Sequence, residues 1–256
     1  MQPYTIKKKN LFIISNRNHL LSEGPIWDYK YSRFLFVDIK KRNFYIYKKN
    51  LLKKFSFKKK ITSIILTKDE RFIILTTSNS IIKYDILRKK KVYSFYNANF
   101  KNERFNDSYA LSKSTILISS MDNNEKKNIG KLYIFKNLNK KKILFGNFII
   151  GNGIDFCKKN KVFYFSISDL GLIKSFKIQN KKTIKTKIFC NIPKKYGVPD
   201  GITVDVFGCV WVACWGGGCL LRYNRYGKIK KIYKIPEKYP TSLCFGGKNM
   251  NKIFFT

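Results

Sequence analysis

The chain of 256 residues is 44% hydrophobic and 16% aromatic, which allows one sizeable core and excludes a disordered protein. Its 53 lysines and arginines against 15 acidic residues give a formal net charge of +38. No apolar run approaches the roughly 20 residues that span a bilayer, and the run at residues 11–14 is too short for a signal peptide. We therefore expect a soluble, cytoplasmic monomer or weak oligomer with no membrane partner.

Two explanations compete for the high charge: a polyanionic partner, or a strongly AT-biased genome that enriches lysine together with Asn, Ile, Phe and Tyr. The lysines form small clusters at the ends of apolar runs, at residues 7–9, 58–60, 89–91 and 140–142. A single basic arm, a recognition helix or an RNA-binding aromatic motif is missing. We favour the genomic explanation and expect no specific nucleic-acid partner, while weak polyanion affinity stays open.

Short strands recur along the whole chain in a fixed order. The second strand of each unit is the clearest, and successive copies lie about 37 to 47 residues apart, the period of propeller blades. These second strands are "RFLFVDI" (33–39), "RFIILTT" (71–77), "STILISSM" (114–121), "KVFYFSIS" (161–168), "GCVWVACW" (208–215) and "NKIFFT" (251–256). A shorter strand precedes each copy, and two further strands follow the first five copies.

Four strands per unit and six units predict an all-β, six-bladed β-propeller, formed by residues 1–256 as one domain. The sixth unit reaches only its second strand, so the last blade is possibly incomplete. We expect the N-terminal segment 1–19 to close this blade, with "NLFIIS" (10–15) as an outer strand. A β-sandwich with accidental spacing is the alternative.

The residues just before the first strand of each unit should converge on the central channel of a propeller. They include Glu23 in unit one, Asn152 in unit four and Asp200 in unit five, each followed by glycine. Unit three offers Arg104, Asn106 and Asp107 in "ERFNDS" at this place. Two carboxylates and an amide oxygen are ligands that a hard divalent cation prefers. Each dipeptide alone is an ordinary turn, but the shared phase favours a site.

Other kinds of site are excluded by missing residues. His19 is the only histidine, so a three-histidine zinc site is impossible, and no nucleophile motif matches it for a Ser-His-Asp triad. We expect His19 to be a solvated loop residue. The six cysteines form no C-x-x-C pair, so we expect buried, reduced thiols and a reducing compartment.

The segments "LLSEGPIWDYKYSRFLFVDIKKRNFYIY", "RFNDSYALS", "GNGIDF" and "VPDGITVDVFGCVWVACWGGGCLLRYN" resemble the gluconolactonase/regucalcin (senescence marker protein) family. The resemblance implies a six-bladed propeller that hydrolyses sugar lactones with one divalent cation (Ca, Zn, Mg or Mn). It implies that Glu23, Asn152 and Asp200 bind the metal.

The resemblance also implies that Arg104 and Asn106 contact the substrate, together with an acid after the second strand of unit three, either Glu125 or Asp122. Two positions depart from the family pattern, since Ser108 and Tyr109 stand where a glycine and a lysine are usual.

The function that follows is opening of a sugar lactone to its aldonic acid by a metal-activated water, with Asp200 as the proton acceptor. Arg104 and Asn106 would hold sugar hydroxyls or the developing oxyanion. A non-catalytic propeller that binds a metal or a protein is the alternative.

Overall fold

The computed structural model describes residues 3–6, 10–15, 18–179 and 182–256. Among these residues the chain forms β-strands and one 3-10 turn, η2 (Lys194–Tyr196), and no α-helix. Over the same part of the chain, no helix has the length and apolar character needed to cross a membrane. The strands are β1 (Tyr4–Thr5), β2 (Ser22–Asp28), β3 (Arg33–Asp38), β4 (Asn43–Lys48), β5 (Leu51–Ser56), β6 (Ile61–Leu66), β7 (Phe72–Thr77), β8 (Ser80–Asp85), β9 (Lys90–Asn97), β10 (Glu103–Ala110), β11 (Thr115–Asp122), β12 (Gly130–Lys136), β13 (Lys140–Phe148), β14 (Gly151–Cys157), β15 (Val162–Ile167), β16 (Leu172–Gln179), β17 (Lys182–Asn191), β18 (Gly197–Val204), β19 (Val210–Gly216), β20 (Cys219–Tyr223), β21 (Ile229–Lys234), β22 (Leu243–Gly246) and β23 (Lys252–Phe255).

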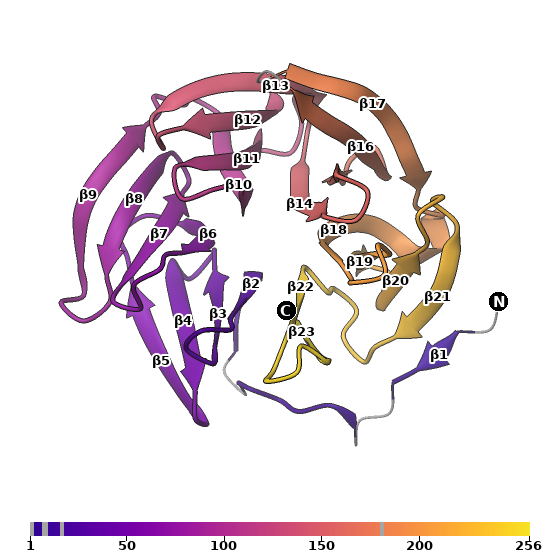
Figure 1. Cartoon of the computed structure of the whole chain (residues 1–256), viewed down its shortest axis with the longest axis horizontal. Helices are drawn as coiled ribbons and strands as arrows, with labels where there is room; N and C mark the ends of the chain where they lie inside the picture. Colours follow the sequence, from indigo (N-terminus) through magenta and orange to yellow (C-terminus); the bar gives the residue numbers. More distant parts are fainter. Residues whose placement is uncertain (1–2, 7–9, 16–17, 180–181) are drawn as a thin grey trace.

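The strands form five complete antiparallel blades around an axis, β2–β5, β6–β9, β10–β13, β14–β17 and β18–β21 (Figure 1). The prediction of a propeller is confirmed, but the prediction of six blades is wrong. The sixth unit contributes only the two-stranded sheet β22–β23, between the first and fifth blades. The predicted second strands of all six units coincide with β3, β7, β11, β15, β19 and β23.

The N-terminal segment does not complete the sixth sheet by strand pairing. Residues 10–15, which we expected to add a strand, form none, and β1 pairs in parallel with β21 as a fifth strand of the fifth blade. Ile6 and Ile14 instead pack on aromatic clusters beside β22–β23. Side-chain packing therefore covers the faces that further strands would cover in a complete blade.

His19 belongs to this packing and is not a solvated loop residue. Its side chain is 14% exposed, and its ring meets the rings of Phe36 and Tyr45 edge-on at 5.4 and 4.9 Å between centroids. Its Nδ1 lies 3.5 Å from Asp38, and its Nε2 lies 2.8 Å from Ser15 Oγ. These contacts give the only histidine a structural role.

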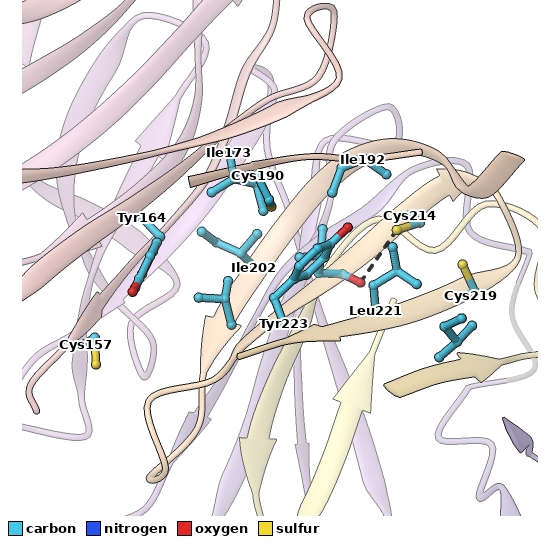
Figure 2. Packing of buried hydrophobic residues seen from close by; sticks show 13 residues of the cluster. Cys157, Tyr164, Ile173, Cys190, Ile192, Ile202, Cys214, Cys219, Leu221 and Tyr223 are labelled. Carbon is cyan, nitrogen blue, oxygen red and sulfur yellow. Dashed lines mark hydrogen bonds between the residues drawn. The ribbon is translucent and has the colours of Figure 1, made fainter. Parts of the chain in front are cut away.

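The core consists of apolar clusters between neighbouring blades. The cluster between the fourth and fifth blades contains Cys157, Cys190, Cys214 and Cys219 beside aliphatic side chains and Tyr223 (Figure 2). All six cysteines are free thiols, and Cys244 is the one that is not fully buried. Here sulfur fills space as a small apolar group.

Candidate metal-binding site at the propeller axis

The candidate residues lie at β-bulges on the inner strands. In all five complete blades, a register shift interrupts the pairing between the inner strand and the second strand. The shift leaves Asn106 and Asp107 unpaired in β10, Asn152 in β14 and Asp200 in β18, and it begins directly after Glu23 in β2. Bulges re-aim side chains and are frequent beside active sites.

The side chains of Glu23, Asn152 and Asp200 are buried and close to one another. Their residues are 9%, 6% and 6% exposed. They lie on β2, β14 and β18, which are inner strands near the axis in Figure 1. Asn152 donates a hydrogen bond to the Asp200 carboxylate, yet Oδ1 of Asp200 is buried and has no hydrogen-bond partner in the described part of the chain. An unpartnered buried carboxylate oxygen is costly, which suggests that it faces a ligand.

Acidic side chains cluster around this oxygen. Burial, the largest cause, raises the pKa of both Glu23 and Asp200 well above the usual carboxyl range, and their mutual repulsion raises the pKa of Asp200 further. Asp107 acts on both carboxyls in the same direction, whereas Arg104 lowers both pKa values. A bound cation would relieve this repulsion, because it stabilises the charged forms of the carboxylates.

Arg104 is the buried cation of the site, and Asn106 holds it. The Arg104 guanidinium donates hydrogen bonds to Asn106 Oδ1 at 2.7 Å and to the carbonyl oxygen of Phe105 at 3.1 Å. Asn106 Nδ2 donates to the carbonyl oxygen of Gly151 at 3.0 Å. Both ends of the Asn106 amide are thus engaged with protein, so here Asn106 positions Arg104 and ties β10 to β14.

The two acids considered after β11 have different surroundings. Asp122 Oδ2 accepts hydrogen bonds from the backbone N–H groups of Lys126 and Lys127, both at 3.0 Å, and thereby closes the β11–β12 turn. Glu125 lies in the same turn with a φ of +54°, is exposed, and acts electrostatically on Arg104. Oδ2 of Asp122 is thus engaged by the turn, although its Oδ1 is buried without a hydrogen-bond partner among the described residues, whereas Glu125 is exposed.

Two further acids lie near the axis: Asp107, which was expected there without a defined role, and Asp155, which was not singled out. Burial raises the pKa of Asp107 to about 6 and that of Asp155 to about 6, and the two carboxylates repel each other. Asp155 Oδ2 accepts hydrogen bonds from the Val204 N–H at 2.7 Å and from the Thr203 hydroxyl at 3.1 Å, which ties β14 to β18. The "ND" dipeptide at 106–107 was the available signal for Asp107.

The glycines after the candidate ligands serve two different purposes. Gly24 has a φ of +53°, which a side chain disfavours. A Cβ at Gly153 would lie 2.5 Å from the Ile202 nitrogen, and a Cβ at Gly201 would lie 2.0 Å from Ser242 Oγ. Gly24 therefore supplies the left-handed residue of the bulge in β2, whereas Gly153 and Gly201 let neighbouring segments approach closely.

The donor set fits a hard divalent cation. In the described part of the chain, no group of three or more His, Cys, Asp and Glu side chains is arranged to hold a metal ion. Glu23, Asn152 and Asp200 instead combine two carboxylates with an amide oxygen, and oxygen donors suit Ca²⁺, Mg²⁺ and Mn²⁺.

Comparisons with known proteins agree with this fold. The family model described as SMP-30/gluconolactonase/LRE-like region matches residues 21–256. An uncharacterized protein of Sulfolobus acidocaldarius is 29% identical over 95% of this chain and 89% of its own length. Human regucalcin is 27% identical over 91% of this chain and 82% of its own length.

Solved structures show the same fold at low identity. The structure described as a calcium-binding protein, regucalcin, from Agrobacterium tumefaciens has a TM-score of 0.89 and 19% identity, covering 95% of this chain and 84% of that one. A luciferin-regenerating enzyme has a TM-score of 0.85 and 22% identity, covering 93% and 84%. The family resemblance drawn from the sequence is confirmed: the chain belongs to the SMP-30/gluconolactonase/LRE-like family.

Proposed function

We propose that this protein is a divalent-metal-dependent hydrolase that opens a sugar lactone to its aldonic acid. The observation that carries the proposal is the buried, unpartnered Oδ1 of Asp200 beside Glu23 and Asn152. Family membership supports a lactonase-type activity, and two solved relatives of the fold are described as a gluconolactonase and a putative gluconolactonase.

Glu23, Asn152 and Asp200 would hold the cation. When bound, the cation supplies Lewis-acid polarisation of the lactone carbonyl and lowers the pKa of a water molecule. Asp200 would accept the proton of the attacking water, because its Oδ1 has no competing hydrogen bond among the described residues.

Arg104 would stabilise the oxygen that gains negative charge, because it is buried and its guanidinium has donors beyond those used on Asn106 and Phe105. Glu125 would accept hydrogen bonds from sugar hydroxyls at the exposed side of Arg104. Asn106 would act as a positioning residue for Arg104.

Ser108 and Tyr109 contact neighbouring blades. Ser108 Oγ lies 2.6 Å from Ser63 Oγ, which links β10 to β6. Tyr109 is partly buried against the cluster that contains Phe163. We expect these residues to alter which lactone fits.

The test is hydrolysis of a panel of aldonolactones by metal-stripped protein supplied with Ca²⁺, Mg²⁺, Mn²⁺ or Zn²⁺ in turn. We expect turnover with at least one cation, loss of turnover in excess chelator, and loss in Asp200→Asn, while Glu237→Gln, at an exposed acid, stays active. Full activity in excess chelator would refute the proposal. The same cation should raise the melting temperature of the wild-type protein and not that of Asp200→Asn.

A metal-dependent rise in melting temperature without turnover of any lactone would favour the second candidate, a non-catalytic metal-binding propeller. The engagement of both ends of the Asn106 amide favours this candidate, because it removes one predicted substrate contact. We propose a cytoplasmic location, since all six thiols are free.

A further inference from the structure

The fourth strand of every complete blade carries lysines and no acidic residue. β5, β9, β13, β17 and β21 each carry two or three lysines, and none of these five strands carries an acidic residue. Four of them, β5, β9, β13 and β17, form the outer edges of their blades, whereas β1 lies outside β21 in the fifth blade (Figure 1). Lysine on an exposed edge discourages strand pairing, and this accounts for a basic rim but not for a binding pocket on it.

One pocket on this rim combines basic and aromatic side chains. It has a volume of about 640 Å³ and lies between the outer part of the fourth blade and the turn between β20 and β21. Lys177, Lys185, Lys187 and Arg225 line it together with Tyr226, and no acidic residue lines it among the described residues. The pocket between the second and third blades, of about 510 Å³, differs because Asp69 is part of its wall.

A buried hydroxyl in the wall lacks a partner. Ser175 on β16 is 3% exposed, lines the pocket, and its Oγ has no hydrogen-bond partner in the described part of the chain. Leaving such a group unsatisfied is unfavourable, so a ligand atom at the pocket would stabilise it. This observation is independent of the surface charge.

We propose that this pocket and the adjoining rim bind single-stranded nucleic acid without sequence specificity. Lys185 and Lys187 both line the pocket, and Lys185 lies in an irregular part of β17 with a φ of +51°, so the strand presents two cationic side chains to phosphates at this place. Tyr226 is 68% exposed and carries the Arg225 guanidinium 4.7 Å from its ring centroid, which leaves ring surface for a base to stack on.

The curved shape of the rim favours binding of a flexible polyanion over binding of a flat membrane. The five basic strands face outward in different directions around the ring, so a flat bilayer would meet only part of the rim at once (Figure 1). A single strand can follow the curve of the rim from β17 toward the fifth blade, where β21 carries further lysines inside β1. Alternating cationic and aromatic side chains are typical of such surfaces.

The test measures binding of fluorescent oligo(dT) by anisotropy at several salt concentrations. Each lost phosphate contact should lower the slope of log K against log salt by about 0.7, so Lys185→Gln/Lys187→Gln should lower it by about 1.4. The control Lys68→Gln/Lys113→Gln, in the acid-containing pocket, should leave the slope unchanged. Lys185→Arg/Lys187→Arg should also retain it.

Stacking is tested separately from charge. Tyr226→Ala should weaken binding at least about fivefold with the same salt slope, whereas Tyr226→Phe should bind as the wild-type protein does. An equal drop in slope for both lysine pairs, or wild-type binding by Tyr226→Ala, would overturn the proposal. So would phosphatidylserine vesicles that bind more tightly than oligo(dT) and show the same loss in the pocket variants, because that result would identify a membrane surface.

Discussion

Replacing Gly153 by alanine tests whether the site depends on the close approach of β14 and β18. A Cβ at Gly153 would lie 2.5 Å from the Ile202 nitrogen, 2.8 Å from the Gly201 Cα and 2.9 Å from the Asp200 carbonyl oxygen. All three atoms belong to the backbone of β18, so no side-chain rotation can relieve the clash. Overpacking typically costs about 1–3 kcal/mol, and a forced backbone shift places this variant near the upper end, about 3 kcal/mol.

The assay is thermal unfolding with and without a divalent cation. For a chain of this size, 3 kcal/mol corresponds to a fall in melting temperature of about 6–12 °C. Because a shift of β18 carries Asp200 with it, the added stabilisation by the cation should also shrink.

Gly171→Ala is the matched control for this substitution. Gly171 has a φ of +62° and open space around its Cβ position, so only left-handed strain of about 1–2 kcal/mol is expected. If Gly153→Ala is no less stable than Gly171→Ala, or keeps the full response to the cation, the close-approach reasoning is wrong.

Two further substitutions separate structural acids from the site. Asp205 accepts hydrogen bonds from the Trp211 indole at 2.9 Å and from the Arg222 guanidinium, so Asp205→Ala should cost about 2–4 kcal/mol in urea unfolding while the response to cations survives. Loss of that response would place Asp205 in the site. Burial raises the pKa of Asp155 from 3.8 to about 6 in the folded state. The folded state therefore binds this proton more tightly than the unfolded state does, and the carboxyl lowers the free energy of unfolding as pH rises from about 4 to 6. Relative to wild type, Asp155→Asn should therefore gain about 2.4 kcal/mol between pH 4 and pH 7, measured by urea unfolding of metal-free protein. A stability difference that is independent of pH would show that Asp155 titrates normally in the fold.

Local patterns made the strands and the three candidate ligands predictable. The run of apolar and β-branched residues in "RFIILTT" is a property of neighbouring residues, and β7 (Phe72–Thr77) follows it closely. Glu23, Asn152 and Asp200 occupy the same position in their repeats, so aligning the repeats was enough to single them out. All three lie on inner strands.

Features that depend on pairing between distant segments were not predictable. Residues 10–15 have a strand-like composition, yet a strand needs a free edge in register, and only Ile14 of the segment finds a packing partner in the core clusters. The bulges that expose Asn152 and Asp200 arise from the register between two strands. The engagement of Asn106 by Gly151 likewise follows from the contact of β10 with β14.

The separation of charge between axis and rim gives the two proposed sites opposite responses to salt. Each outer strand lies three strand spacings from its inner strand, about 14 Å, so the rim lysines act on the axis through their long-range field. At about 0.01 M salt the screening length is about 30 Å, so the field of the rim lysines opposes cation binding at Glu23 and Asp200. At about 0.1 M salt the screening length is only about 10 Å, so this repulsion of the cation becomes weaker. The two buried carboxylates act at contact distance and are screened much less. Cation affinity, followed by calorimetry, should therefore rise over the range in which oligo(dT) affinity falls. A parallel fall of both affinities would mean that the cation binds at the solvated surface and not at the axis.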